Sequence, residues 1–291
     1  MDRDQQKLFL FLVFLGSVLE FAESGFNAVY LKQTNATLTC GNPPEEFFET
    51  QQGFISSIDR VPFTCNASDP ARAYPPENMV DGLLGTHWQS SAGEDLAFIT
   101  ISFEQAFFAQ HINITFGNYR RPGAIKVEKS TDFGATFTPW HYLVTSPARR
   151  QCSVQFGVDA FQGLISRVDQ VLCTEYIRYV PPEYNETISI ELNQKQRGDG
   201  SQDSYTPGLQ HHYTVREIEV TGRCDCKGHA DGNHCPLNQG FRACQCEGNT
   251  CGVHCDECCP IYNQFPWKIG NGAPWTNDPA AKCEQGNITG L

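Results

Sequence analysis

The sequence predicts an all-β protein, an antiparallel β-sandwich followed by a small module held together by disulfides. Short runs in which apolar and polar residues alternate recur along the first part of the chain, separated by Gly and Pro. No long stretch shows the 3.6-residue period of a helix. Cysteine density then divides the chain, with four cysteines in residues 25–223 and ten in residues 224–283. The first part can bury a core of its own, whereas the second needs covalent links.

The N-terminus predicts a secreted protein. Residues 8–19 form an apolar run of twelve residues, too short to span a bilayer and typical of the core of a signal peptide. Small residues at Ala22 and Ser24 place the cleavage near Ser24, so that residues 1–24 are the signal peptide. No later segment is apolar enough to span a membrane. The remaining 19 basic and 29 acidic residues give a net charge of −10, which argues against nucleic-acid binding.

Four segments of the first part show the period of two that indicates a half-buried strand. The alternating segments are residues 99–103, 125–128, 188–192 and 217–220. In residues 217–220, Ile218 and Val220 alternate with Glu217 and Glu219. By contrast, residues 194–210 are polar and rich in glycine, and predict a loop.

Five Asn-x-Ser/Thr sequons agree with secretion and predict surface positions for glycans. The five acceptors are Asn35, Asn66, Asn113, Asn185 and Asn287. Asn113 is the most informative, because it alternates with Ile112 and Ile114 and so faces solvent on a strand.

Three interpretations compete for the cysteine-rich part. A zinc site could use Cys224-x-Cys226 or Cys255-x-x-Cys258 with nearby histidines, and a redox enzyme could use Cys255-x-x-Cys258. A disulfide scaffold would use all ten cysteines. The oxidising compartment favours the scaffold, since it converts an even set of clustered thiols to disulfides, and argues against zinc.

Two of these cysteines, Cys258 and Cys259, are adjacent and seek different partners. Neighbouring Cα atoms are about 3.8 Å apart, whereas a disulfide usually needs about 4.4–6.8 Å. The spacing alone leaves the partners of both residues open.

The module resembles a laminin-type EGF-like module, specifically the first one of laminin alpha chains. The spacing C-x-C-x8-C-x8-C-x-C from Cys224, the segment GHAD and the segment NTCGVHCDECCPIYNQFPW carry the resemblance. Five disulfides are implied by it. They are Cys224–Cys235, Cys226–Cys244, Cys246–Cys255, Cys251–Cys259 and Cys258–Cys283.

The preceding region, residues 25–223, resembles the laminin N-terminal domain, which netrins share. The resemblance lies in NMVDGLLGTHWQS at residues 78–90, RPG at 121–123, STDFG at 130–134 and YTVREIEVTGR at 213–223. It implies a jelly-roll-like sandwich before the EGF-like module of residues 224–283 and a tail of residues 284–291. It also implies the disulfides Cys40–Cys65 and Cys152–Cys173.

The chain departs from the family pattern in three respects. It carries fewer cysteines near Cys65, and the polar loop 194–210 replaces a segment that is rich in strands in the family. It shows a single EGF-like module with no coiled-coil heptads, so the sequence as it stands does not join a laminin trimer through a helical rod.

Calcium is the ligand that the family resemblance implies for the loop at residues 78–86. Ca²⁺ takes several oxygen ligands, and backbone carbonyls serve as well as carboxylates. By position, Asp81 would supply a carboxylate, Thr86 a hydroxyl or carbonyl and Asn78 a carbonyl, with a further ligand from the backbone near Arg216. The alternative is an ordinary Asp-Gly turn.

Other candidates each have a simpler explanation. Trp88 could mark a sugar-binding groove, although a lone aromatic beside a strand usually packs in the core. Arg197, Gly198 and Asp199 form an RGD tripeptide that could bind an integrin, although tripeptides recur by chance. The pairs Arg120-Arg121 and Arg149-Arg150 could bind heparan sulfate or be solvated charge. We find no catalytic motif, and Glu45-Glu46 needs only solvation.

The sequence therefore predicts a secreted, glycosylated protein of the extracellular matrix or basement membrane that is not an enzyme. The resemblance implies calcium-dependent assembly with other laminin N-terminal domains, in which a chain without a coiled coil would cap the network. The alternative is a netrin-like secreted cue or an integrin-binding adhesion ligand.

Overall fold

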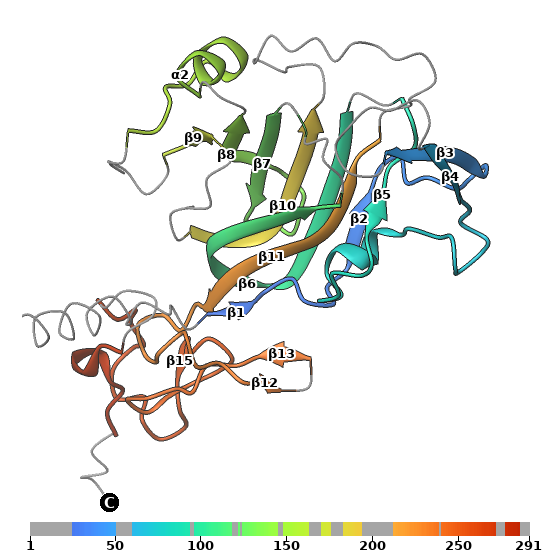
Figure 1. The fold of residues 1–291 in the computed structure, drawn as a ribbon. Coiled ribbons are helices and arrows are strands. Elements are labelled where there is room, and N and C mark those ends of the chain that lie inside the picture. Colours follow the sequence, from blue (N-terminus) through green and yellow to red (C-terminus); the bar gives the residue numbers. More distant parts are fainter. Residues whose placement is uncertain are drawn as a thin grey trace, which may run out of the picture.

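The computed structural model describes residues 25–50, 60–93, 96–117, 122, 124–144, 148–162, 170–175, 183–193, 212–238, 240–271 and 277–285. Strands dominate these residues (Figure 1). The strands are β1 (Phe26–Asn27), β2 (Thr34–Ala36), β3 (Glu45–Thr50), β4 (Arg60–Cys65), β5 (Trp88–Gln89), β6 (Leu96–Phe116), β7 (Ala124–Ser130), β8 (Thr138–Val144), β9 (Leu172–Glu175), β10 (Glu183–Asn193), β11 (Thr214–Cys224), β12 (Leu237–Asn238), β13 (Phe241–Arg242), β14 (Thr250–Cys251) and β15 (Glu257–Cys258). The helical turns are η2 (Pro76–Met79), α2 (Ala148–Gln151), η3 (Cys152–Phe156) and η4 (Pro279–Ala281).

One curled sheet of nine strands forms the first part of the molecule, residues 25–223, which we call the sandwich. Its main path runs β1-β11-β6-β10-β7-β8-β9, with β2 paired to β6 and β5 paired to β11. Every pairing in this sheet is antiparallel except the parallel pairing of β8 with β9. The predicted all-β, antiparallel fold is confirmed.

The long strand β6 gives the sheet its strong curl (Figure 1). Its first half lies between β2 and β10, and its second half pairs with β11. Between the halves, Glu104 adopts a positive φ of 59°, which interrupts the alternation of the strand. The strand therefore turns at this point and lines two sides of the same core.

The core follows the alternation that the sequence predicts. Ile99, Ile101 and Phe103 of β6 are fully buried, and Ile218 and Val220 of β11 face the same interior. The segment of residues 188–192 lies within β10, whose side chains are outside the description. A period of two thus places the apolar side chains of these strands on the core face.

Trp88 belongs to this core. Its side chain is 0% exposed, and its indole Nε1 donates a hydrogen bond to Thr39 Oγ1 at 2.9 Å. A ring with no exposed face cannot stack on a sugar, so the sugar-groove hypothesis for Trp88 is wrong.

All fourteen cysteines are paired in seven disulfides. The bonds are Cys40–Cys65, Cys152–Cys173, Cys224–Cys235, Cys226–Cys244, Cys246–Cys255, Cys251–Cys259 and Cys258–Cys283. These are the pairs that the family resemblance implies, and the adjacent Cys258 and Cys259 reach in opposite directions along the chain. Because no cysteine is free, neither zinc nor thiol chemistry has a thiolate to use.

Several sequence predictions lie outside the described residues. They are the signal peptide of residues 1–24, the loop 194–210 with Arg197, Gly198 and Asp199, the pair Arg120-Arg121, and Asn287. Within the described part of the chain, no helix is long and apolar enough to cross a bilayer.

Candidate functional site

The loop that joins η2 to β5 brings together the three side chains that the sequence predicts as calcium ligands. Asn78 lies in η2, Asp81 follows two residues after it ends, and Thr86 comes just before β5. Thr86 Oγ1 donates a hydrogen bond to Asp81 Oδ2 at 2.7 Å. The Asn78 amide closes the loop by donating to the His87 carbonyl at 2.9 Å. The side-chain NH₂ group of Asn78 therefore stabilises the loop. Only the side-chain and backbone carbonyl oxygens of Asn78 are left as groups that could bind a cation.

Asp81 also forms the Asp-Gly turn that the sequence offers as the simpler explanation. Its Oδ1 accepts a hydrogen bond from the Leu83 backbone amide at 2.8 Å, and Gly82 adopts a φ of 75°. A side chain at Gly82 would meet the ring of Tyr30 at 3.0 Å. The turn and a cation site are compatible, because the turn holds the Asp81 carboxylate in place while its oxygens keep further lone pairs.

Glu217 of β11 is the residue that sequence reasoning missed. Alternation places it opposite Ile218 and on the side of Glu219, and in a strand with one buried face that side meets solvent. Instead the side chain of Glu217 is 4% exposed, while Glu219 remains exposed. The loop after η2 covers Glu217. Because this contact joins segments that are far apart in sequence, the pattern of residues 213–223 does not predict it.

Little compensates for the burial of the Glu217 carboxylate. Neither of its oxygens makes a hydrogen bond of normal geometry. Burial is the main cause that raises the pKa of Glu217, and the negative charges of Asp81 and Glu219 act in the same direction, while the Gly82 backbone amide lowers it in part. Together these effects raise the pKa of Glu217 to about 7. Such a group needs either a proton or a cation at this position.

The neighbourhood of Glu217 supplies oxygen ligands and no nitrogen or sulfur cluster. Among the described residues, no group of three or more His, Cys, Asp or Glu side chains is close enough to hold a metal ion. The oxygen groups here are two carboxylates, the Thr86 hydroxyl and loop carbonyls, which are the kinds of ligand that Ca²⁺ accepts. The unpaired carboxylate of Glu217 therefore fits the ion that the family resemblance implies.

The strand that carries Glu217 is bulged beside the loop. The register of β11 against β6 shifts between Val215 and Glu217, so that Arg216 is the extra residue and points outward. Arg216 Nη1 donates to the Leu84 carbonyl at 3.4 Å. The segment near Arg216, whose backbone the sequence predicts as a further ligand, therefore lies against the loop.

The described sequons differ in their surroundings. Asn35 on β2 is exposed. Asn66 is partly buried, and its Oδ1 accepts a hydrogen bond from the Ser68 amide at 3.0 Å. Asn113 on β6 is partly buried and donates to Glu219 Oε2 at 3.0 Å. Asn185 lies on β10, where side chains are not described.

The remaining charged candidates show ordinary structural roles. Glu45 accepts hydrogen bonds from Ser91 Oγ at 2.9 Å and from the Ala92 amide at 3.1 Å, so it does more than face solvent. It ties the start of β3 to the loop after β5. Arg150 of α2 is exposed, which is compatible with both a heparan sulfate contact and solvated charge.

Comparison with solved structures adds no argument about function. Chitosan-binding module 1 of a chitosanase/glucanase from Paenibacillus sp. IK-5 aligns with 68% of this chain and 99% of its own, at 10% identity and a TM-score of 0.38. A likeness at this level supports no conclusion about a ligand.

Comparison with known sequences finds relatives that match most of this chain. The laminin subunit alpha of Drosophila melanogaster is 30% identical over 310 residues, covering 87% of this chain and 8% of that protein. Human Netrin-G2 is 27% identical, covering 88% of this chain and 56% of that protein. The chain thus spans a small part of the laminin relative and about half of the netrin relative. The family model Laminin N-terminal (Domain VI) matches residues 22–227, and the chain therefore belongs to the laminin N-terminal family.

Proposed function

We propose that this chain is a secreted component of the extracellular matrix whose sandwich domain binds other laminin N-terminal domains in a calcium-dependent manner. The observation that carries the proposal is the buried, unpaired carboxylate of Glu217 beside Asp81. Its relatives are laminin alpha subunits and netrins, and its seven disulfides suit an oxidising compartment. We infer a basement-membrane location and a role in recognition, with no catalytic step.

The residues of the loop define how the site would work. Asp81, Glu217, the Thr86 hydroxyl and a carbonyl of Asn78 would hold Ca²⁺, which supplies two positive charges against the two carboxylates. In the calcium-free protein these carboxylates repel each other, and the repulsion loosens the loop from β11. With both charges balanced, the loop is held against the strand and presents one fixed surface to a partner domain.

Calcium binding is tested with recombinant protein of residues 25–291 by isothermal titration calorimetry and thermal unfolding. Ca²⁺ is expected to raise the melting temperature, because at a free concentration of 100 times Kd it stabilises the fold by about 2.7 kcal/mol. Glu217→Gln should weaken binding at least about tenfold, since it removes a charged ligand from the site. The matched control is Glu219→Gln, on the same strand but exposed. Equal calcium affinity in the two variants would refute the site.

Partner binding is tested separately, by measuring association with laminin short arms with and without a chelator. Loss of binding on chelation supports the assembly role. Residues 25–291 contain no heptad repeat, so we expect this recombinant protein to occupy one position and inhibit laminin polymerisation. Calcium binding without any laminin association would refute the assembly role while leaving the metal site standing.

A second candidate function is a netrin-like cue or adhesion ligand, which the coverage of Netrin-G2 favours. Its signature would be calcium-insensitive binding to cells. If the RGD tripeptide is responsible for that binding, Asp199→Glu should abolish it, because the added methylene displaces the carboxylate that an integrin binds. Cell binding that is lost on chelation and survives Asp199→Glu would count against this candidate.

A further inference from the structure

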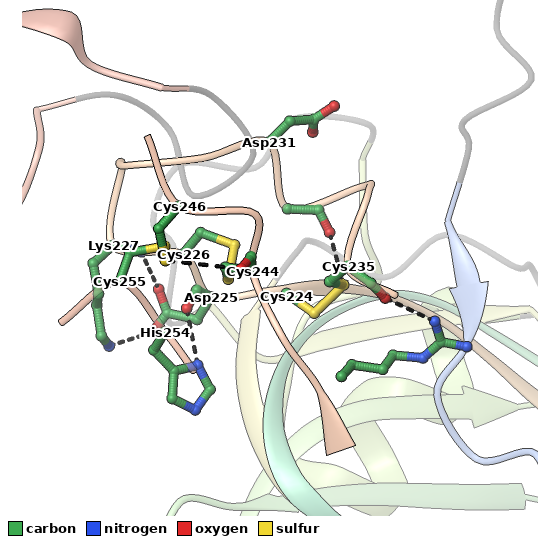
Figure 2. The surroundings of a disulfide bond; sticks show 12 residues. Cys224, Asp225, Cys226, Lys227, Asp231, Cys235, Cys244, Cys246, His254 and Cys255 are labelled. Atoms are coloured by element: carbon green, nitrogen blue, oxygen red, sulfur yellow. Dashed lines mark hydrogen bonds and ion pairs between the residues drawn. A yellow bond between two sulfur atoms is a disulfide. The ribbon is translucent and has the colours of Figure 1, made fainter. Parts of the chain in front are cut away.

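The sandwich and the disulfide-rich module meet where β11 ends. Cys224 is the last residue of β11, pairs with Phe107 of β6 and is bonded to Cys235 of the module. Its backbone amide donates to the Gly232 carbonyl of the module at 2.9 Å. One residue is therefore part of both the sheet ladder and the module. Figure 2 shows this junction, with Cys224, Cys226, Cys235 and Cys244 close together beside the end of the strand.

A second connection comes from Gln105, in the turning segment of β6. The side chain is 7% exposed. Its Nε2 donates to the Arg242 carbonyl at 2.7 Å, and its Oε1 accepts from the Arg242 backbone amide at 3.0 Å. The primary amide thus satisfies both backbone groups of one residue of β13, as a neighbouring strand would. The positive φ of the preceding residue, Glu104, lies at the point where β6 leaves its regular path beside β10.

A third connection is made by the side chain of Arg242. Its guanidinium carbon lies 3.9 Å from the ring centroid of Phe26 in β1, and Nη1 donates to the Cys235 carbonyl at 3.0 Å. Phe26 in turn packs edge-on against Phe107, with ring centroids 5.2 Å apart. The planar guanidinium is therefore held between a ring of the sandwich and a carbonyl of the module.

The apolar core continues through the same region. Cys224, Cys226, Ala230 and Cys235 belong to the buried cluster that also contains Phe107 of the sandwich. Burial lowers the pKa of Arg242. An arginine guanidinium stays charged in proteins, so the side chain contributes a cation to this junction. The strand, the amide pair, the cation–π contact and the shared core all act between the same two parts of the molecule.

We propose that Gln105 is a positioning residue that, with Arg242 and Phe26, locks the module onto the sandwich as one rigid body. The lock fixes the direction in which the module leaves the sandwich. A partner bound to the sandwich would then be held at a set angle to whatever follows the module, without a flexible joint between them. This inference concerns geometry within the chain and stands whether or not the sandwich binds calcium or a laminin domain.

The test measures backbone residual dipolar couplings of deuterated residues 25–291. In the wild-type protein, one alignment tensor should fit amides from both the sandwich and the module. Gln105→Leu keeps the size of the side chain but removes both hydrogen bonds, and leaves a buried backbone donor and acceptor at Arg242 unsatisfied. We expect the two parts to require different tensors in this variant, and hydrogen exchange at the Arg242 amide to accelerate about tenfold or more.

The matched control is Gln33→Leu, the same change at an exposed position of the sandwich. It should leave one common tensor. If Gln105→Leu is not secreted, Gln105→Asn takes its place, because it keeps the amide but shortens its reach. Arg242→Lys keeps the charge and loses the planar stack, and it should loosen the joint to a smaller degree. Separate tensors in the wild-type protein, or one common tensor and unchanged exchange in the Gln105 variant, would overturn the lock.

Discussion

At the scale of the residue, Glu217 shows how burial changes the acidity of a common side chain. Its neighbour Glu219 lies two positions along the same strand and stays exposed. The loop that carries Asp81 covers only one of the two. The same residue type is therefore solvated charge at position 219 and an unpaired buried acid at position 217.

The raised pKa of Glu217 predicts how pH affects the calcium-free protein. Because the pKa rises from an ordinary 4.5 to about 7 in the folded state, the protonated carboxyl favours folding. This stability is fully present below about pH 4.5 and is lost as the pH rises through about 7. In excess chelator at pH 8, Glu217→Gln should therefore raise the free energy of unfolding by about 2 kcal/mol. Urea unfolding at pH 4 and pH 8 measures the difference, which should vanish at pH 4.

At the scale of the element, the module holds its shape through contacts between its own loops. His229 Nε2 hydrogen-bonds with the Lys268 carbonyl at 2.9 Å, and the Asp278 amide donates to the Gly228 carbonyl at 2.7 Å. Gly228 and Gly270 touch backbone to backbone between these contacts. With few regular hydrogen-bond ladders in the module, such close approaches hold the loop of residues 268–271 in place.

Replacing Gly270 with alanine should break this contact. The added Cβ would lie 2.6 Å from the Gly228 carbonyl oxygen, and backbone cannot move aside as a flexible side chain can. We expect a loss of about 1–3 kcal/mol in the free energy of unfolding and faster hydrogen exchange at the Asp278 amide. Gly85→Ala is the control, because nothing lies within 4 Å of its Cβ position. Equal stability of the two variants, measured in chelator, would contradict the expectation.

At the scale of the whole molecule, two different sources of stability meet in one chain. The sandwich buries an apolar core and places its four cysteines at 0–2% exposure. The module is loop-rich and depends on five bonds, and several of its cysteines, such as Cys251 and Cys259, are only partly buried. Covalent links therefore matter most where the core is smallest.

This difference predicts the order of reduction. At a low concentration of a thiol reductant, the module disulfides should open first, because their sulfurs are the more accessible to attack. Mass spectrometry after alkylation should find Cys251, Cys258 and Cys259 labelled before Cys40 and Cys65. Near-UV circular dichroism should retain the signal of the buried Trp88 and Trp140 at that stage. Early labelling of the sandwich cysteines would contradict this order.

The sequence by itself determined the features that depend on local pattern. Alternating residues fixed the strands and their inward faces, as Ile99, Ile101, Ile218 and Val220 show. The family resemblance, which the cysteine spacing helps to carry, implied the seven pairs that the structure contains. The loop with Asp81 and Thr86 became a candidate through the family resemblance, which the contiguous residues 78–90 carry.

Only the tertiary structure decided what depends on segments that are distant in sequence. Glu217 lies 136 positions from Asp81, and Gln105 lies 137 positions from Arg242. The burial of Glu217 depends on the covering loop, and the reach of Gln105 depends on the turn in β6 at Glu104. The sequence does not distinguish a polar side chain that faces water from one that faces another strand, because burial is a property of the folded chain and not of the residue.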